Sequence, residues 1–277
     1  MRYKKTPNTY IAAGDRKLDH SNYDDFFQYY AEQSLTKDTF ARFLNVRTKI
    51  LSLLGPQRAQ QCLQVADIGC GAGTQSFLWA ELGHQVVGID ISERLIQLAR
   101  ERGSKDTGKV GFYVGTATEL PWPDRSMDVC LVPELLEHVA DWKRCLNELV
   151  RVLKPGGVLY LSTTNNLCPK QSEFNLPLYA WYPGFLKRHY EKLAMTTHPE
   201  LANYATYPAV NWFNFYSLRA ALGSDQFDCL DRFDSRLHLP DSNKKAILLK
   251  ILHSMPVLKF LARMCTPYTE MMAIKRP

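Results

Sequence analysis

Three glycines at alternate positions mark the part of the chain whose residues are best suited to hold a ligand. Gly69, Gly71 and Gly73 follow a short apolar run and precede a helical pattern, which predicts a strand, a tight turn and a helix. Glycine in such a turn lets the backbone approach a bound molecule closely. The spacing is G-x-G-x-G, whereas a dinucleotide turn has G-x-G-x-x-G, and the Lys-Ser or Lys-Thr of a phosphate-binding loop is missing. Because Asp67 beside the turn would repel a pyrophosphate, the site favours a cationic ligand.

A second carboxylate, Asp90, ends the next predicted strand, 21 residues after Gly69. In nucleotide-binding α/β folds an acidic residue about 20 positions beyond the glycine turn accepts hydrogen bonds from the ribose hydroxyls. The turn alone is a weak signal, because such glycines also occur for structural reasons. Its combination with Asp90 predicts a site for a cationic ligand that contains a ribose.

The elements that position these residues alternate along residues 61–165. Short apolar runs predict strands, and segments of helical period separate them, which is the pattern of a parallel sheet covered by helices. Five strands are expected, at Gln64–Ile68, Gln85–Asp90, Val110–Val114, Asp128–Val132 and Val158–Ser162. The intervening helices are expected at Thr74–Leu82, between Ser92 and Gly103, and between Asp141 and the run Lys154-Pro-Gly-Gly157.

The rest of the chain has a different pattern. Residues 17–54 are expected to form helices before the first strand, and residues 167–213 contain ten aromatic side chains in 47 positions, nearly double the chain's 12% average. A helix near Tyr216–Leu222 and two further strands, at Gln226–Ser235 and Thr269–Lys275, complete the expected elements.

The composition is that of a globular chain. With 277 residues, 45% hydrophobic and 22% charged, it can bury the core of one large domain, and a net charge of +6 does not by itself indicate nucleic-acid binding. The seven cysteines are scattered and never spaced as C-x-x-C, so neither a metal site nor a disulfide framework is expected. No apolar run has the length of a signal peptide or a membrane span, and we expect a cytoplasmic protein.

Four segments resemble the successive motifs of class I S-adenosylmethionine-dependent methyltransferases. They are VADIGCGAGTQS, VVGIDIS, GTATELPWPDRSMDVCLVPELLEHVADW and LNELVRVLKPGGVLYLSTTN, and the resemblance spans about residues 64–166. It is greatest to the branch of the ubiquinone-biosynthesis O-methyltransferases and related small-molecule enzymes. The resemblance implies an α/β, doubly wound, Rossmann-like fold with a seven-stranded sheet of order 3-2-1-4-5-7-6 and an antiparallel seventh strand. Gln226–Ser235 and Thr269–Lys275 would supply strands six and seven.

The same resemblance implies which residues bind the cofactor. It puts Gly69, Cys70 and Gly71, beside Asp67, against the amino-acid portion of S-adenosylmethionine. The remaining contacts would be Asp90 on the ribose, Ile91 on the adenine, and Pro133, Glu134 and Leu135 at the sulfonium.

Two further cofactor contacts are implied less directly, one on the adenine and one on the methionine carboxylate. Thr116 and Ala117 stand where the family often has an acid that meets the adenine amino group, and here they would offer a hydroxyl and a backbone amide. Arg47, in an Asn45-Val-Arg47 element similar to one of the family, would pair with the methionine carboxylate. A solvated helix arginine is the alternative for Arg47.

His138 is the candidate catalytic residue. It follows the fourth strand, at the edge where open α/β sheets bind ligands, and an imidazole with an ordinary pKa near 6.5 suits a general base that takes a proton from a hydroxyl acceptor. The alternative is a histidine that orders its loop. Glu134 and Glu137, three residues apart, could orient His138 or the substrate, while a cofactor contact for Glu134 and a solvated position for Glu137 remain open.

The acceptor side is expected after strand five. Asn165 and Asn166 could orient a polar acceptor or simply form a turn. The aromatic insertion at 167–213, which includes Tyr179, Trp181 and Tyr182, has the composition of a lid over an apolar or aromatic substrate. Packing of a large loop would explain the same side chains.

These observations predict one methyltransferase domain over residues 1–277. Its parts are an N-terminal helical cap (1–60), the cofactor-binding core (61–166), the aromatic lid (167–213) and the last helix and strands (214–277). The expected activity is methyl transfer from S-adenosylmethionine to a small, apolar or aromatic acceptor, at oxygen. The alternatives are an RNA methyltransferase and a non-catalytic S-adenosylmethionine-binding partner protein.

The last part of the chain contains a basic amphipathic insertion at 243–264. Apolar residues recur at helical spacing with lysines and arginines between them, and Pro256 divides the stretch into two helices too short to span a bilayer. Such helices could lie on a membrane surface. Packing on the sheet edge, or in the contact of a homodimer, is the alternative.

Overall fold

The computed structural model describes residues 31–32, 34–103, 108–202, 209–238 and 243–277. Their strands form one sheet of seven, in the order β3-β2-β1-β4-β5-β7-β6, with β7 antiparallel to both of its neighbours. The strands are β1 Gln64–Ile68, β2 Gln85–Asp90, β3 Val110–Val114, β4 Met127–Pro133, β5 Leu153–Thr164, β6 Phe227–Asp231 and β7 Tyr268–Lys275. The expected fold class, strand order and antiparallel seventh strand are confirmed.

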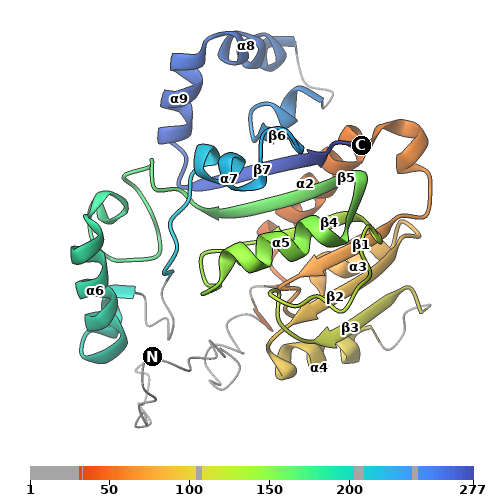
Figure 1. Ribbon diagram of the computed structural model, residues 1–277, viewed down its shortest axis with the longest axis horizontal. Coiled ribbons are helices and arrows are strands. Elements are labelled where there is room, and N and C mark those ends of the chain that lie inside the picture. The colour runs from red at the N-terminus through yellow and green to blue at the C-terminus, as the bar shows by residue number, and fades with distance from the viewer. Residues whose placement is uncertain (1–30, 33, 104–107, 203–208, 239–242) are drawn as a thin grey trace.

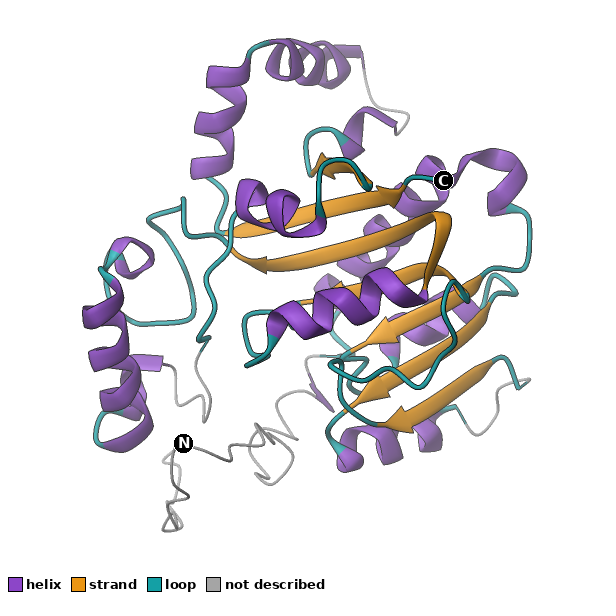
Figure 2. Cartoon of the chain, in the orientation of Figure 1, coloured by secondary structure: helices purple, strands orange, loops and turns teal. Residues whose placement is uncertain are grey.

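Helices cover both faces of the sheet (Figures 1 and 2). They are α2 Lys37–Ala59, α3 Thr74–Ala80, α4 Glu93–Arg102, α5 Trp142–Val152, α6 Gly184–Thr196, α7 Phe215–Leu222, α8 Asn243–Ser254 and α9 Pro256–Met264, with short 3-10 turns η2 Tyr179–Trp181, η3 Pro199–Ala202 and η4 Ser235–His238. One core cluster packs α5 and α7 against the sheet, and a second packs α2 and α3 against its other face. Burial of the strands on both faces explains their continuous apolar sequences.

Two strand ends differ from the sequence expectation for identifiable reasons. β5 begins at Leu153 rather than Val158, because Leu153 already pairs with Met127 and the Pro-Gly-Gly run lies inside the strand beside a register shift. β6 ends at Asp231 rather than Ser235, because the Asp231 carboxylate accepts hydrogen bonds from the amides of Phe233 and Asp234 and turns the chain.

The N-terminal helical region is only partly visible. Residues 17–30 of the expected helices lie outside the described residues, and α2 continues to Ala59, beyond the expected end at residue 54. The helix is kinked at Gly55, which has a φ of 79° outside the helical range and is followed by Pro56. Val46 and Ile50 bury the first half of α2 against the sheet.

The basic amphipathic insertion forms two helices, α8 and α9, divided at Pro256 as expected, and they lie beyond β6 and β7 at the top of Figure 1. The basic face of α9 points inward: Lys259 lies 2.5 Å from the Asp234 carboxylate and Arg263 lies 2.5 Å from that of Asp231. Val257 and Leu261 are 72% and 49% exposed. Ion pairs therefore anchor the helix, and its apolar face is not covered by the described residues.

Within the described residues, no helix combines the length and apolar character that crossing a membrane would need.

Candidate active site

The carboxyl ends of β1, β2 and β4 meet at one edge of the sheet, where parallel neighbours must end together (Figure 2). The turn after β1 is tied to the next strand, because the amides of Gly69 and Cys70 both donate to the carbonyl of Ile89, over 2.8 and 3.2 Å. The sequence-predicted glycines and Asp90 are thereby brought to the same place.

The glycine turn forms a cradle that side chains would close. Gly71 has φ of 52°, and a Cβ built on it would meet no atom within 4 Å, so its open side faces free space. Gly73 has φ of 81°, and its Cβ would come within 2.6 Å of the Phe112 ring. Gly71 therefore leaves room for a ligand, while Gly73 allows α3 to pack against β3.

Asp90 holds this turn in place. Its Oδ2 accepts a hydrogen bond from the Gly71 amide over 2.9 Å, and its Oδ1 accepts one from the Ser92 amide over 2.8 Å. A carboxylate oxygen can accept more than one hydrogen bond, so these contacts are compatible with the predicted contact to the ribose hydroxyls. Ile91, the next residue, is 38% exposed beside it.

The proposed adenine-side residues lie next to Asp90. The Gly115 amide donates to the Asp90 carbonyl over 3.0 Å and brings Thr116 to this edge. The Thr116 hydroxyl, however, interacts with the Thr118 hydroxyl at 2.8 Å and also accepts from the Thr118 amide. Ala117 is buried in the main core cluster. Thr116 therefore shapes the turn, and its contact with the adenine stays a prediction.

The segment after β4 packs onto the glycine turn. A Cβ on Gly69 would lie 3.2 Å from Leu135 Cδ1, so the Leu135 side chain covers that glycine directly. Glu134 has φ of 50°, in the left-handed region that non-glycine residues rarely adopt, and its amide donates to the Ser162 carbonyl. Such backbone strain is typical of functional sites. His138 follows in the next turn, where its side chain is half-buried and its amide donates to the Leu135 carbonyl.

Arginine contacts at this edge differ from the expectation. Arg47 donates to the carbonyl of Leu78 in α3, and burial lowers the pKa of its guanidinium. Its described partner is therefore the backbone, not the glycine turn. It is Arg42, five residues earlier on α2, that reaches the edge, where its guanidinium pairs with the Glu134 carboxylate at 2.5 Å. Sequence spacing on α2 gave no signal that distinguishes the two.

The aromatic lid is attached to the loop that contains His138. The amides of Val210 and Asn211 both donate to the Glu137 carbonyl, over 3.0 and 3.1 Å. The Asn211 side chain donates to the carbonyls of Leu136 and Val139, over 3.0 and 2.8 Å. Asn211 thus holds the His138 loop from both sides. It was not among the sequence-predicted site residues, and only its position at the end of the lid could have indicated it.

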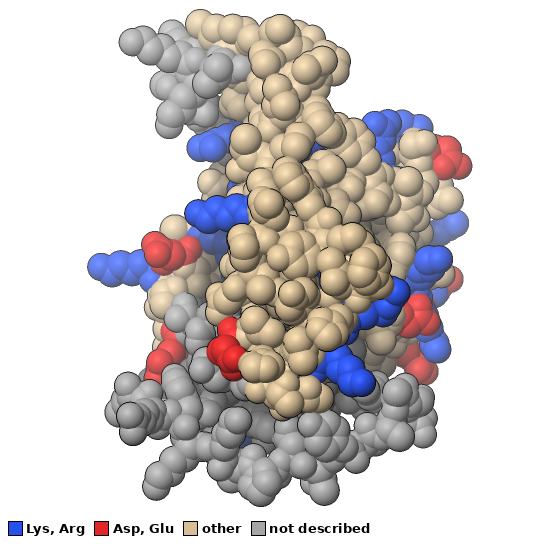
Figure 3. Space-filling view, turned by 90° about the vertical axis from the view of Figure 1, so that its left-hand side faces the viewer, with Lys and Arg blue, Asp and Glu red and all other residues tan. Residues whose placement is uncertain are grey.

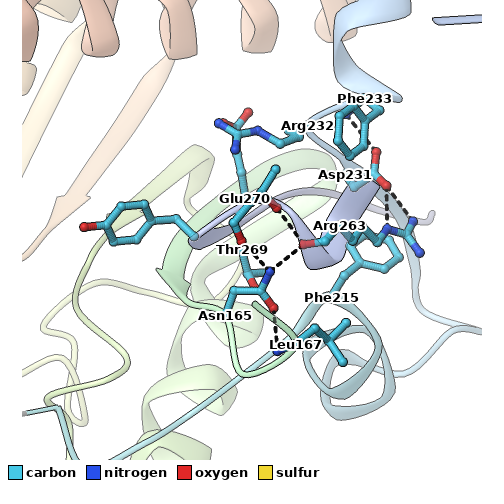
Figure 4. Close-up of a pocket in the computed structure, with 11 residues that line it drawn as sticks. Asn165, Leu167, Phe215, Asp231, Arg232, Phe233, Arg263, Thr269 and Glu270 are labelled. Atoms are coloured by element: carbon cyan, nitrogen blue, oxygen red, sulfur yellow. Dashed lines mark hydrogen bonds and ion pairs between the residues drawn. The ribbon is translucent and has the colours of Figure 1, made fainter. Parts of the chain in front are cut away.

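The two asparagines after β5 have structural roles. The Asn165 side chain donates to the carbonyls of Arg263 and Thr266 and accepts from the Leu167 amide (Figure 4). Asn166 donates to the Trp212 carbonyl and accepts from Asn214. The cavity in Figure 4, beside Asn165, has a volume of 20 Å³, enough for one water molecule. The hydrogen bonds of Asn165 agree with the alternative that it forms a turn and fixes the loops, while its contact with an acceptor stays a prediction.

Much of the lid's aromatic content forms a small core of its own. Tyr179 is fully buried, stacks on Phe174 with 4.0 Å between ring centroids, and donates its hydroxyl to the Lys187 carbonyl. Tyr182 packs against Tyr179 as well. Trp181 differs, since it is 50% exposed and its indole donates to the Leu167 carbonyl. Packing accounts for the position of Tyr179, and its assignment to the substrate stays a prediction. Tyr204 and Tyr207 lie outside the described residues.

Comparison with known proteins agrees with this geometry. Residues 66–161 match the family described as a methyltransferase domain. Malonyl-[acyl-carrier protein] O-methyltransferase of Serratia marcescens is 33% identical over 111 residues, 40% of this chain and 42% of that protein. Ubiquinone biosynthesis O-methyltransferase of Coxiella burnetii is 30% identical over 152 residues, 49% of this chain and 65% of that protein. Residues 66–161 form an S-adenosylmethionine-dependent methyltransferase domain.

The alignments cover less than two thirds of the length of either relative. Among solved structures, phosphoethanolamine N-methyltransferase 2 of Haemonchus contortus superposes with a TM-score of 0.58 at 17% identity, over 94% of this chain and 60% of that one. An S-adenosylmethionine-dependent methyltransferase of Mesorhizobium loti gives 0.53 at 19%, over 82% of this chain and 95% of that one. At these identities the likeness shows that the fold is shared.

The methyltransferase site fits a cationic cofactor. Asp67 is buried, the Ser76 hydroxyl donates to its Oδ2 over 2.6 Å, and its Oδ1 has no hydrogen-bond partner among the described residues. Burial, opposed by the hydrogen bond from Ser76 and supported by the negative charge of Asp90, raises the pKa of Asp67 to about 7. The unpartnered oxygen of Asp67 and the neighbouring Asp90 carboxylate are suited to a ligand that brings a positive charge. Asp67, Asp90 and the Gly71 cradle would hold S-adenosylmethionine.

More carboxyl groups surround the His138 loop. Glu137 is buried and accepts a hydrogen bond from the Thr163 hydroxyl over 2.9 Å. Burial raises the pKa of Glu137 to about 8, with smaller contributions from the charges of Glu173 and Glu134. The pKa of Glu173 is raised as well, by burial and then by Glu134. The coulombic parts of these shifts show that negative charge of neighbouring carboxylates reaches this edge, and such charge would favour a cation such as a sulfonium ion.

Asp90→Ala should weaken binding of S-adenosylhomocysteine by about 1.5–3 kcal/mol, because hydrogen bonds to a charged group are lost. Asp90→Asn, which keeps one acceptor oxygen, should lose less. Calorimetric titration measures both, with the exposed Glu93→Ala as a control that keeps wild-type affinity. Unchanged affinity in Asp90→Ala would reject the ribose assignment.

Glu137→Gln should change how stability depends on pH. Because the pKa of Glu137 is raised on folding from 4.5 to about 8, the stability linked to its protonated form is fully present below pH 4.5 and is lost as pH rises to about 8. Relative to Glu137→Gln, the wild type should therefore lose roughly 3–5 kcal/mol of unfolding free energy over that range. Urea unfolding at several pH values measures it. A difference no larger than that of the exposed Glu119→Gln would contradict the account.

Proposed function

We propose that this chain, acting as one methyltransferase domain with an N-terminal helix and a lid, transfers a methyl group from S-adenosylmethionine to the oxygen of a small apolar or aromatic molecule. The observation that supports it best is the meeting of the Gly71 cradle, Asp90 and the Leu135–His138 turn at one edge of the sheet. The two O-methyltransferases that match this domain support oxygen as the methylated atom.

In this proposal the glycine turn and its neighbours bind the cofactor. Backbone of Gly69, Cys70 and Gly71 lies against its amino-acid portion, Asp90 accepts from its ribose, and Ile91 packs on its adenine. Pro133 and Glu134 border its sulfonium, which supplies an activated methyl group when bound. The chain's task is then to align the acceptor in line with that group and to exclude water, and such alignment lowers a barrier by up to about 7–11 kcal/mol.

His138 acts as the base for a hydroxyl acceptor. Asn211 binds the carbonyls on either side of this loop, at Leu136 and Val139, and the Leu135 carbonyl accepts from the His138 amide. These hydrogen bonds fix the backbone that presents the imidazole. A positioned base contributes about 10²–10⁴ in rate.

The lid supports an apolar acceptor. Leu178, Trp181 and Phe185 are exposed on it, although most of its other described aromatic side chains pack inward. Figure 3, which views the left-hand side of Figure 1, shows a broad central area without charged side chains. An apolar molecule held there would lie near the loop to which the lid is bonded.

His138→Ala should lower turnover by about 10²–10⁴, while affinity for S-adenosylhomocysteine stays within about threefold. Turnover is measured as transfer of label from the cofactor to small molecules of a cell extract, and affinity by calorimetry. The exposed His198→Ala serves as the control, with both values unchanged. Normal turnover in His138→Ala would contradict the role as a base and would mean that His138 only orders its loop. Label that appears in RNA instead would favour an RNA methyltransferase, and absence of any turnover would favour a non-catalytic binding partner.

We also propose that the protein works in the cytoplasm in contact with a membrane surface, through the exposed apolar face of α8 and α9. Ile247, Ile251, Val257 and Leu261 contribute to this face, and the ion pairs of Lys259 and Arg263 hold it outward. An interfacial helix buries such a face among lipid headgroups.

Wild-type protein should sediment with anionic liposomes at low salt. The double variant Val257→Asp with Leu261→Asp should not, because it places charges on the apolar surface that the membrane would bury. Leu82→Asp, at an exposed position after α3, is the matched control and should still sediment. Wild-type protein that stays in the supernatant would contradict the membrane contact. A concentration-dependent dimer that the same double substitution dissociates would assign the face to a second copy.

A further inference from the structure

A cavity of 470 Å³ lies outside the residues assigned to the cofactor. It is formed by one face of α2, the turn at η4, the start of β7 and the inner side of α8. Its size falls within the range of about 300–1,000 Å³ that is usual for small-molecule sites. The residues that give it its character are Arg42, Lys49, Arg232, Arg236, Leu249 and Leu252.

The charges in this cavity are unbalanced. Four cationic side chains line it, and Glu270 is the acidic residue among its lining. The buried Lys49 ammonium lies 2.5 Å from the Glu270 carboxylate, while the Arg232 guanidinium is 3.9 Å from it. Lys49 therefore takes most of that negative charge, and Arg232 is only weakly compensated.

The remaining two arginines add to the excess. Arg42 is paired with Glu134 at the catalytic edge. Arg236 is exposed, and no hydrogen bond or ion pair of the described residues involves it. After Glu270 and Glu134 are counted, two positive charges of the four remain uncompensated. Cations gathered in a concave site with apolar walls attract an anion more strongly than the same cations on an open surface.

We propose that this cavity binds a phosphate group on a ligand with an apolar part. Guanidinium groups form paired, charge-assisted hydrogen bonds with phosphate oxygens, and the cavity offers three of them beside one ammonium. Val46, Leu249 and Leu252 line the same space and provide the apolar surface. The phosphate belongs either to a soluble phosphate monoester or to the headgroup of a phospholipid.

The site adjoins the methyltransferase edge through Arg42. This side chain lines the cavity and also pairs with Glu134, which follows β4. Phosphate at the cavity competes with Glu134 for the Arg42 guanidinium, so occupancy is communicated to the loop that leads to His138. Binding itself does not depend on the proposed methyl transfer.

The test removes the two arginines least engaged in the fold. Arg232→Gln with Arg236→Gln keeps the buried Lys49–Glu270 pair and the Arg42–Glu134 pair, so the chain should fold. Arg219→Gln, an exposed arginine on α7 outside the cavity, is the matched control. Calorimetric titrations use inorganic phosphate and glycerol phosphate at constant ionic strength, and vesicles of phosphatidylcholine with or without phosphatidylglycerol. Binding of S-adenosylhomocysteine reports whether each variant is folded.

We expect saturable phosphate binding at one site in the wild type and in Arg219→Gln, and binding at least tenfold weaker in the double variant, since each charge-assisted hydrogen bond is worth about tenfold or more. If glycerol phosphate shows this pattern and vesicles do not, the source is a soluble ester. If vesicles with phosphatidylglycerol show it, the source is a lipid headgroup. No saturable binding in either arm, or equal loss in the double variant and in Arg219→Gln, would overturn the proposal even if methyl transfer is established.

Discussion

The hydrogen bond from the Gly71 amide to the Asp90 carboxylate is the interaction on which the active-site edge depends. It joins the turn after β1 to the end of β2, so the cradle and the carboxylate cannot move independently. The same carboxylate accepts from the Ser92 amide and so fixes the start of α4. Since Leu135 packs over Gly69, the loop with His138 is positioned against this unit as well.

Carboxyl groups gather at this edge, where Asp90, Glu134 and Glu173 act as negative charges on their neighbours. Asp67 and Glu137 are both buried, and burial raises the pKa of each. A protein keeps such costly groups where a ligand or a mechanism uses them, because burying an acid destabilises its charged form. The phosphate-binding cavity has the opposite charge, on the other side of the Arg42–Glu134 pair. This ion pair therefore separates a site suited to a cation from one suited to an anion.

The sequence predicted features that short segments determine, and it did not predict those that depend on contacts between distant segments. The strand, glycine turn and Asp90 are encoded in short segments with strong backbone requirements, and the resemblance of those segments supplied the strand order. The roles of Asn211 and Arg42 depend on contacts with residues 136–139 and 134, far along the chain, which no spacing rule could give. Periodicity also identified α9 but not its orientation, because Lys259 and Arg263 face inward only where Asp234 and Asp231 are present to pair with them. The burial of Tyr179 in the lid's own core was not predictable, because aromatic composition does not distinguish such a core from a substrate surface.

A crystal structure of the chain with S-adenosylhomocysteine tests the central claim most directly. The account predicts that both ribose hydroxyls lie within hydrogen-bond distance of Asp90, that the amino-acid portion lies along Gly69–Gly71, and that the sulfur lies beside Pro133 and Glu134. A ligand bound elsewhere, or one bound at this edge without contact to Asp90, would contradict it.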